Sequence, residues 1–382
     1  MKATPFRQFV LKVHSRCNLS CSYCYVYEMA DQSWRSQPLR MSDSTIEYTI
    51  HRMAEHVRKH GLESVSVVLH GGEPLLAGID FIARLVEMLR ARVPVPVDVR
   101  VQTNGVLLTE AVLRRLMEQR VRVGVSLDGD ARATERHRRF ADGRSSYGQV
   151  RQALQLLASD EFRACYDGIL CTIDLSNDPV VTYQALLDYS PPAIDFLLPH
   201  GNWSNAPPGR PPYGSATPYA NWLLTIFDRW YLSPAAPIRL FQELIQLILG
   251  GTAAVEGLGL QPSTVIFVDT GGAIKQLDSL SATYPGAPDT GLNVVSDSFD
   301  AALAHPLTIL RQDTVASLCA TCSSCSIVQI CGGGLLPHRY HTRTGFVNPS
   351  VYCPDLLHLI TTIRARVLRD ISQAISRARC PR

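Results

Sequence analysis

Short apolar runs alternate with longer helical patterns along the first half of the chain. Several of the runs are apolar at almost every position, as in parallel strands that helices cover on both faces. Strands are expected at Phe9–His14, Val65–His70, Val97–Thr103, Arg122–Leu127, Ile169–Asp174 and Ile194–Pro199. Apolar residues recur at helical spacing in Ser44–Lys59, Phe81–Arg92, Glu110–Gln119, Tyr147–Ala158 and Val180–Tyr189. This alternation predicts an α/β fold, a partial, TIM-like (β/α)6 barrel that does not close.

The second half of the chain departs from this alternation. A proline-rich stretch from Pro191 to Pro218, with Trp203 inside it, cannot hold regular structure. It is either a surface connector or the wall or lid of a substrate channel. Helical patterns follow at Tyr219–Tyr231 and Pro354–Arg377. Since 382 residues exceed one average domain, we expect a barrel domain in residues 1–235 and a smaller domain in residues 236–382.

Composition and charge exclude several classes of protein. The apolar fraction of 46% supplies a core and argues against disorder. Acidic and basic residues are interspersed and leave a net charge of +3, which argues against nonspecific nucleic-acid binding. No apolar run approaches the roughly 20 residues that span a bilayer, and the first nine residues lack the features of a signal peptide. We expect a cytoplasmic protein with neither nucleic-acid nor membrane partners.

Most of the eleven cysteines fall in two tight groups. In a large intracellular chain, such groups favour metal binding over disulfides. The first group is Cys17, Cys21 and Cys24, and the second is Cys319, Cys322, Cys325 and Cys331, with Cys353 beyond it. Closely spaced thiolates favour iron-sulfur or zinc over magnesium or calcium. Cys165, Cys171 and Cys380 stand apart, and we expect the first two to be buried apolar thiols.

The first group is one thiolate short of ligating every iron of a four-iron cluster, which leaves one iron open to a small-molecule chelate. The aromatic Tyr23 precedes the third cysteine and suits a nucleoside base. Gly71, Gly72, Glu73 and Pro74 follow the group further along the chain. With these motifs the chain resembles the radical S-adenosylmethionine (SAM) enzymes. In that family SAM chelates the open iron of a [4Fe-4S] cluster through its amino and carboxylate groups.

Polar motifs follow the ends of four predicted strands, where barrels of the TIM type gather their chemistry. The resemblance assigns the following residues to the SAM site: Tyr23, Gly71, Gly72, Glu73, Gln102, Asn104, Ser126, Asp128, Arg138 and Leu198. It implies that Glu73 accepts a hydrogen bond from the SAM amine. In the basic loop Arg132–Arg144, otherwise expected to be a solvated surface, Arg138 best matches the arginine that pairs with the SAM carboxylate. The adjacent Arg139 remains an alternative.

The spacing Cys322-x2-Cys325-x5-Cys331 with a later Cys353 resembles the SPASM domain, a module that carries auxiliary iron-sulfur clusters. The full pattern has seven cysteines and two clusters, but Leu277 and Leu335 stand here at cysteine positions. We therefore predict one auxiliary cluster, of the [4Fe-4S] type that the resemblance implies, held by Cys322, Cys325, Cys331 and Cys353. Cys319 is a surplus thiol, either an alternative ligand or a bystander. A structural zinc site is the other interpretation, because four thiolates also suit tetrahedral zinc.

The overall pattern most resembles the FxsB-type radical SAM/SPASM peptide maturases. The resemblance covers nearly the whole chain, including Cys24–Trp34, Leu198-Pro-His200 and Cys331–Asp355. It implies that a 5′-deoxyadenosyl radical takes a β-hydrogen from a precursor peptide and that the carbon radical joins an aromatic ring to form a cyclophane. Asp278 is implied as the base, the auxiliary cluster as the electron acceptor, and flavodoxin or ferredoxin as the external donor. His338 and Arg339 either bind the peptide, tune the cluster potential or are structural.

Other functions remain open at this point. The enzymatic alternatives are thioether crosslinking and formylglycine formation in sulfatases, against which the missing second auxiliary cluster counts. A nonenzymatic alternative is an iron-sulfur electron carrier or redox sensor, but Glu73 and Tyr23 argue against it because a carrier needs no open iron.

No leader-binding domain precedes the first strand, so leader recognition is expected to use this domain pair or another protein, for example by strand addition to a sheet edge.

Overall fold

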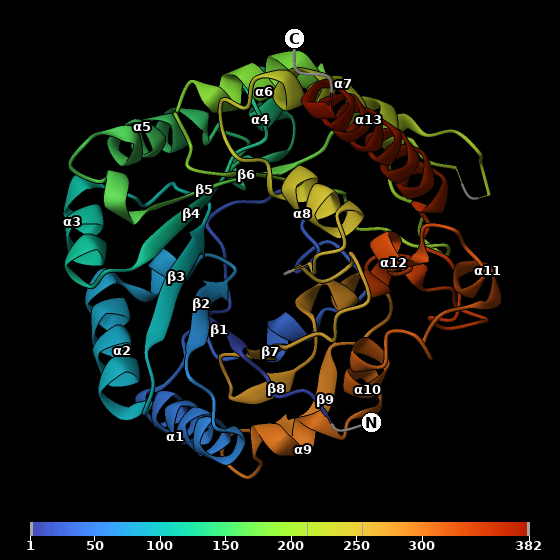
Figure 1. Cartoon of the computed structure of the whole chain (residues 1–382). Helices are drawn as coiled ribbons and strands as arrows, with labels where there is room; N and C mark the ends of the chain where they lie inside the picture. The colour runs from blue at the N-terminus through green and yellow to red at the C-terminus, as the bar shows by residue number, and fades with distance from the viewer. Residues whose placement is uncertain (1–2, 212, 254, 380–382) are drawn as a thin grey trace.

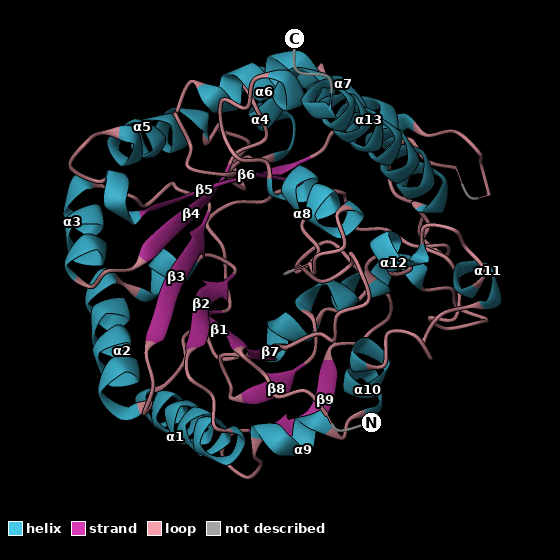
Figure 2. Cartoon of the chain, viewed as in Figure 1, coloured by secondary structure: helices cyan, strands magenta, loops and turns pink. Residues whose placement is uncertain are grey.

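A computed structural model describes residues 3–211, 213–253 and 255–379 of the chain. Pro212 of the proline-rich stretch and the isolated Cys380 lie outside the described residues. Helices form an outer layer around a curved sheet of strands (Figure 2). The sheet has nine strands in the order β6-β5-β4-β3-β2-β1-β7-β8-β9.

The first six strands are parallel and form the expected partial barrel (Figure 1). They are β1 (Gln8–His14), β2 (Val65–Gly71), β3 (Val97–Thr103), β4 (Arg122–Ser126), β5 (Tyr166–Thr172) and β6 (Ile194–Leu197). Each bound lies within three residues of its prediction. The predictions succeed because buried parallel strands are nearly continuous apolar runs, as in β1, where every residue after Gln8 is buried.

The helices between these strands lie on the outer side of the sheet (Figure 1). They are α1 (Asp43–His60), α2 (Ile79–Arg92), α3 (Glu110–Glu118), α4 (Ala131–His137), α5 (Tyr147–Ala158) and α6 (Pro179–Leu187). Side chains cap several of their first turns, as Ser42 does for α1 by accepting from the Thr45 amide. The short helix α4 replaces part of the predicted solvated loop Arg132–Arg144, and Asp130 caps it. Its seven residues are mostly polar and show too little apolar periodicity to be recognised in the sequence.

The sheet continues beyond the six predicted strands. Strand β7 (Val265–Val268) pairs in parallel with β1, and β8 (Ala273–Lys275) and β9 (Asp289–Asn293) follow in antiparallel pairing. These strands are three to five residues long, so their apolar pattern is too short to predict. One buried core runs from Phe6 to Val367. The division at residues 235 and 236 stays a prediction, since sheet and core are continuous across it.

The remaining helices belong to the second half of the chain. They are α7 (Pro218–Leu232), α8 (Arg239–Ile248), α9 (Phe299–Leu303), α10 (Pro306–Gln312), α11 (Ala320–Ser323), α12 (Val328–Cys331) and α13 (Cys353–Arg379). The long C-terminal helix α13 packs along α7 (Figure 1). In the part of the chain that the structure describes, no helix combines the length and apolar character needed to cross a membrane.

Among the described residues of the proline-rich stretch, none between β6 and α7 lies in a helix or strand, as predicted. The stretch is nevertheless anchored to the second half of the chain. The indole of Trp203 donates a hydrogen bond to the Pro349 carbonyl over 2.7 Å, and Arg210 forms a buried ion pair with Asp355 over 2.9 Å. The stretch therefore fastens the start of α13 to the barrel.

Candidate active site

A cavity of about 220 Å³, here called the main cavity, lies where the parallel strands end. Most of the residues that the sequence assigns to the SAM site line it: Cys17, Cys21, Cys24, Tyr23, Gly71, Gly72, Gln102, Asn104, Ser126, Arg138 and Leu198. They follow different strands of the barrel. The parallel topology brings them together because the carboxyl ends of parallel strands meet at one edge.

The three-cysteine loop follows β1 and is held by hydrogen bonds to its first thiol. The Cys17 sulfur accepts from the Leu19 amide at 3.3 Å and from the Asn104 side chain at 3.6 Å. Burial raises the pKa of Cys17 to about 12 and that of Cys24 to about 11. The thiols are therefore protonated near neutral pH until a metal centre displaces the protons.

Two glycines bring the β2 turn against the cysteine loop. The Gly72 amide donates to the His14 carbonyl at 2.9 Å, and the Glu73 amide donates to the Arg16 carbonyl at 3.0 Å. A Cβ atom on Gly72 would lie 2.4 Å from the Arg16 carbonyl oxygen. Since backbone cannot move aside easily, only glycine permits this approach.

The distances between the thiol sulfurs bear on whether each cysteine group suits a single zinc ion or a larger cluster. Four thiolates around zinc at 2.3 Å stand about 3.8 Å apart. Within residues 3–211, 213–253 and 255–379, only His56, His60 and Asp300 place three such ligand atoms within 4.8 Å of one another. Neither cysteine group is that compact in the described residues, and closely spaced thiolates also suit a larger iron-sulfur cluster.

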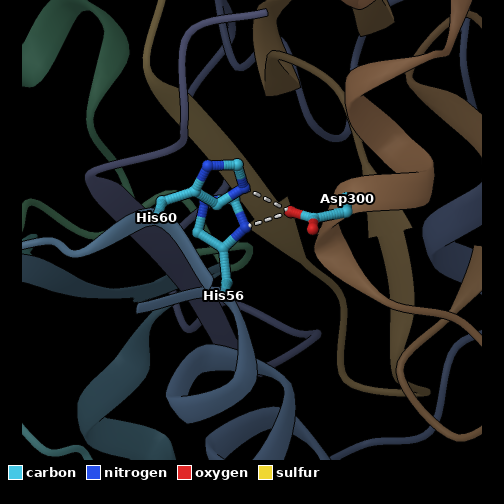
Figure 3. A group of neighbouring side chains, drawn as sticks. All are labelled: His56, His60 and Asp300. Atoms are coloured by element: carbon cyan, nitrogen blue, oxygen red, sulfur yellow. Dashed lines mark hydrogen bonds and ion pairs between the residues drawn. The ribbon is translucent and has the colours of Figure 1, made fainter. Parts of the chain in front are cut away.

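The group of His56, His60 and Asp300 is a hydrogen-bonded clamp (Figure 3). The Phe6 amide donates to Nε2 of His56 at 3.0 Å, so the proton of the neutral ring lies on Nδ1 and faces Asp300 at 2.6 Å. Lys59 occupies the other carboxylate oxygen at 2.6 Å. The group therefore joins α1 to α9. It leaves no position for a metal, because both nitrogens of His56 are hydrogen-bonded and the Lys59 ammonium lies beside Asp300.

Glu73 differs from its expected placement because it is fully buried and does not line the main cavity. Its carboxylate accepts from the amides of Leu75 and Asn104 at 3.0 and 2.8 Å and from the Thr103 hydroxyl at 2.7 Å. Burial raises the pKa of this carboxyl above its ordinary value. One lone pair of the second oxygen stays open, because a carboxylate accepts about four hydrogen bonds. Glu73 thus fixes the turns after β2 and β3 and keeps capacity for one further donor.

A buried network surrounds Tyr23. Its hydroxyl donates to the Asp128 carboxylate and accepts from Arg138 at 2.9 Å. Burial raises the pKa of Asp128, and the positive charge of Arg138 opposes that rise. Arg138 lines the main cavity and its Nε has no hydrogen-bond partner, whereas Arg139 is exposed. Of the two predicted arginines, the structure therefore brings Arg138 to the site.

Gln102 and Ser126 come from adjacent strands and meet in the wall of the main cavity. The Gln102 amide donates to the Ser126 hydroxyl at 3.1 Å. Gly124 lies between them in space, since a Cβ there would fall 2.4 Å from the Gln102 side-chain oxygen. Both side chains keep polar atoms at the cavity, as the sequence analysis expects.

Sequence reasoning missed Tyr25, His70 and His200 as lining residues of the main cavity. Nδ1 of His70 and Nδ1 of His200 are buried and have no hydrogen-bond partner. Burial lowers the pKa of His200 to about 4, so its ring is neutral near pH 7. The position of His70 directly before Gly71 at a strand end was the available signal, whereas His200 was noted only within the Leu198-Pro-His200 motif.

Asp278 is buried behind the main cavity and is not part of its lining. One of its oxygens pairs with Lys12 on β1 at 3.3 Å, and the other oxygen has no hydrogen-bond partner. Burial alone would lower the pKa of Lys12, but Asp278 and Asp269 together raise it. The charge of Asp278 also acts on Tyr25 and His70, which do line the cavity.

The second cysteine group lies where α11, α12 and the start of α13 meet. The Cys322 and Cys319 thiols are hydrogen-bonded to each other, and Cys331 and Cys353 are near enough to act on Cys322 electrostatically. Burial raises the pKa of Cys322 to about 12 and that of Cys331 to about 11. Cys319 thus lies within this group in space, and its role as an alternative ligand or a bystander stays a prediction.

Arg339 and His338 have different surroundings beside this group. Arg339 is buried and donates to the carbonyls of Phe346 and Ser317, so it braces the backbone. His338 is buried and its Nε2 has no hydrogen-bond partner. Cys165 and Cys171 are buried away from both groups, which confirms the predicted apolar thiols.

Comparison with known proteins places these observations in a family. Residues 11–186 match the Radical SAM superfamily. The chain is 25% identical over 291 residues to the cysteine-type anaerobic sulfatase-maturating enzyme of Clostridium perfringens, covering 72% of this chain and 74% of that protein. It is 27% identical over 256 residues to the serine-type anaerobic sulfatase-maturating enzyme of Bacteroides thetaiotaomicron, covering 60% of each.

Solved structures share the fold of the whole chain. Native anSMEcpe with bound AdoMet superposes with a TM-score of 0.82 at 20% identity, covering 95% of this chain and 98% of that one. Streptococcus suis SuiB bound to S-adenosylmethionine gives a TM-score of 0.61 at 14% identity, covering 92% and 77%. The α/β fold predicted from the sequence is therefore confirmed.

The family match covers the cysteine loop, the glycine turn and the Arg138 network, which share the main cavity. An iron-sulfur cluster and SAM are the cofactors of this superfamily, and the thiol spacing fits the cluster. The protein is accordingly an enzyme whose residues 11–186 form a radical SAM domain.

Proposed function

We propose that this enzyme modifies a ribosomally made precursor peptide by joining an aromatic ring to a β-carbon, which forms a cyclophane. The observation that carries the proposal is the main cavity, in which the three-cysteine loop and Arg138 share one space with Tyr25, His70 and His200. That space extends beyond the SAM residues and offers aromatic and neutral polar groups to a substrate. Leu277 and Leu335 at cysteine positions favour a single auxiliary cluster over the two of the full SPASM pattern.

A peptide substrate is supported by proteins of the same fold. One solved structure is described as native anSMEcpe with bound AdoMet and Cp18Cys peptide, with a TM-score of 0.79. Another is SuiB bound to precursor peptide SuiA, with a TM-score of 0.61. Since the identities are 20% and 14%, these peptides illustrate the use of the fold and do not identify the substrate of this chain.

When bound, SAM and a reduced cluster at Cys17, Cys21 and Cys24 supply a 5′-deoxyadenosyl radical, and a cluster at Cys322, Cys325, Cys331 and Cys353 supplies an electron acceptor. Within the SAM site, Arg138 would pair with the SAM carboxylate, and the open lone pair of Glu73 would accept from the SAM amine if that amine reaches past the cavity wall. Tyr23 holds Arg138 in position through the Asp128 network. Gln102, Asn104, Ser126 and Leu198 complete the walls.

Forming the aryl-carbon bond removes one hydrogen atom from the β-carbon and one proton and one electron from the arene. We assign the proton to Asp278, whose second oxygen is unpartnered. Lys12 keeps this carboxylate paired until the proton arrives. Asp278 is buried and does not line the cavity, so the proton needs a relay, and we infer that Tyr25 or His70, which line the cavity, supplies it.

The electron that reduces the SAM cluster comes from an external carrier such as flavodoxin or ferredoxin. We place the reaction in the cytoplasm, because none of the ten cysteines in the described part of the chain is in a disulfide. Free thiols persist in a reducing compartment.

Formylglycine formation is the second candidate, favoured by the sulfatase-maturating relatives. Both reactions begin with removal of a hydrogen from a β-carbon. They differ in the fate of that carbon, which becomes an aldehyde in one case and an aryl-bonded centre in the other. The same cavity could serve either reaction, so the identity of the product must distinguish cyclophane formation from formylglycine formation.

The deciding experiment is anaerobic co-expression of the enzyme with the precursor peptide encoded beside it, followed by tandem mass spectrometry. A cyclophane gives a loss of two hydrogens, no fragments between the joined residues and no reaction with an aminooxy probe. Formylglycine from serine gives the same loss of mass, normal fragmentation and a positive aminooxy reaction. An aldehyde product would contradict the cyclophane proposal.

A further inference from the structure

A second cavity of about 220 Å³ lies between β6, α7, α8 and the first turns of α13. Its wall is largely aliphatic, with Leu223, Leu240, Leu258, Leu335, Leu356 and Leu359 among the lining side chains. It shares Leu197, Leu198 and His200 with the main cavity. The two cavities are therefore neighbours across a single layer of side chains, and Leu335, which stands at a cysteine position of the SPASM pattern, faces the second one.

Two buried histidines mark the junction of the cavities. The rings of His200 and His338 lie 5.7 Å apart, and Tyr25 packs edge-on against His200 at 4.8 Å. Nδ1 of His200 and Nε2 of His338 have no hydrogen-bond partner. Burial lowers the pKa of both rings, so each is neutral and offers one donor and one acceptor. A buried ring nitrogen is costly when unpaired, so the junction has unused capacity for a hydrogen bond.

The charged groups at the wall are already paired. Asp195 pairs with Arg239, Glu256 with Arg311 and Asp355 with Arg210. None of these carboxylates remains to attract a cationic side chain. The occupant that suits such a wall is uncharged and apolar.

The volume of the second cavity further limits which groups could occupy it. An apolar cavity of about 150 Å³ in another protein holds benzene, so about 220 Å³ accommodates one aromatic side chain. A single large side chain is the best match.

We propose that the second cavity binds one aromatic side chain of the peptide substrate, while His200 and His338 hydrogen-bond the peptide backbone at the junction with the main cavity. This inference rests on the proposed peptide substrate but not on the kind of bond formed. The cavity would hold an aromatic residue near the residue whose β-hydrogen is removed. It would thereby select the reacting position within the precursor.

The first test uses toluene as the probe and thermal unfolding of the anaerobic holoenzyme as the readout. Binding to the folded state raises the unfolding midpoint, so saturating toluene is expected to raise it for the wild type. Leu240→Trp fills the cavity and is expected to abolish the shift, as is Leu335→Phe. Both positions are only partly buried, which leaves room for the larger side chain. Leu249→Trp, at an exposed position after α8, is the matched control and keeps the shift.

The second test measures peptide turnover in the same variants. Loss of one buried aromatic contact corresponds to a rise in KM of roughly 10- to 100-fold. Formation of 5′-deoxyadenosine without peptide is expected to stay unchanged in Leu240→Trp and Leu335→Phe. His338→Phe keeps the ring but loses its nitrogens and is expected to raise KM as well.

The outcomes separate this inference from the proposed function. A toluene shift that is absent in the wild type, or that persists in both cavity variants, overturns the inference. Unchanged KM in both variants also overturns it. An aldehyde product together with the expected toluene and KM effects supports the inference while contradicting the cyclophane proposal.

Discussion

Single residues decide how closely the parts of the SAM site approach one another. Gly72 is the clearest case, because the turn after β2 hydrogen-bonds the backbone of the cysteine loop at His14 and Arg16. A side chain at this position meets backbone atoms and cannot be accommodated by a rotamer change. A loop-to-loop contact of this kind depends on the absence of a Cβ atom.

Gly72→Ala is expected to abolish SAM cleavage because the added methyl separates Glu73 from the cysteine loop. The measurement is 5′-deoxyadenosine formed per chain after anaerobic reconstitution with dithionite. Gly148→Ala is the control, since a Cβ there meets nothing within 4 Å and lies in helix α5. The control should retain full activity and gain about 0.5–1 kcal/mol of stability. Normal SAM cleavage by Gly72→Ala would show that the close approach is dispensable.

Asp278→Asn tests the assigned proton acceptor without changing the size of the side chain. Formation of 5′-deoxyadenosine should continue because the SAM residues are untouched, while crosslinked product should fall by about 10²- to 10⁴-fold. Both products are quantified in one reaction by mass spectrometry. Asp128→Asn, in the Tyr23 network, should instead reduce 5′-deoxyadenosine itself. Equal yields of product per 5′-deoxyadenosine in wild type and Asp278→Asn would remove Asp278 from the mechanism.

At the scale of helices and strands, neighbouring elements are joined by ion pairs between their side chains. The clearest joint binds α1 to α9 through Asp300, which accepts from His56 and His60 and pairs with Lys59 (Figure 3). Burial alone would raise the pKa of Asp300, but its hydrogen bonds to Lys59, His60 and His56 lower it to about 2. The joint fixes the helix after β9 against the first helix of the barrel.

Asp300→Asn is expected to lower the free energy of unfolding by about 1–2 kcal/mol, because the lowered pKa reflects stabilisation of the charged form. Because the pKa of Asp300 is lower in the folded than in the unfolded state, its charged form stabilises the fold. This stabilisation is complete above the unfolded pKa near 3.9 and is lost as the pH falls toward the folded pKa of about 2. The difference from wild type should therefore persist down to pH 5 in thermal unfolding of the holoenzyme. Asp228→Asn, in an exposed pair with Arg366, is the control and should change little. A difference that vanishes by pH 5 would contradict the assignment.

At the scale of the whole molecule, the second half of the chain closes onto the barrel. Strand β7 extends the barrel sheet beside β1, and α13 packs along α7 (Figure 1). The buried pair of Arg210 and Asp355 anchors the residues that follow Cys353. The second cysteine group is thus held rigidly beside the histidine junction, where an electron acceptor would be useful.

Iron content tests the number of clusters in the whole molecule. Two four-iron clusters predict about eight iron atoms per chain, compared with about twelve for the full SPASM pattern. Cys331→Ser should lower the content to about four. Cys319→Ser is the matched control within the same group and should retain about eight, since four other thiols remain. Loss of a cluster in Cys319→Ser, with Cys322→Ser unaffected, would reassign the ligand set.

The sequence predicted the barrel well because its strands are continuous apolar runs and its helices have clear periodicity. It also identified the thiols, the glycine turn and Arg138, since those motifs depend on spacing along the chain. It did not predict β7–β9 or α4, which are too short or too polar to show a period. It assigned Glu73 to the SAM amine, which stays a prediction, but it did not foresee that this carboxylate also joins the turns after β2 and β3.

Local chemistry was therefore determined by the sequence itself: which residues form strands, which thiols stand close enough to share a cluster, and where glycine is required. Only the tertiary structure decided which distant residues meet. Lys12 pairs with Asp278 across 266 positions of sequence, and His200 comes within 5.7 Å of His338. The second cavity draws its wall from residues between Asp195 and Leu359. Such meetings depend on how the helices pack around the sheet, and periodicity along the chain carries no information about them.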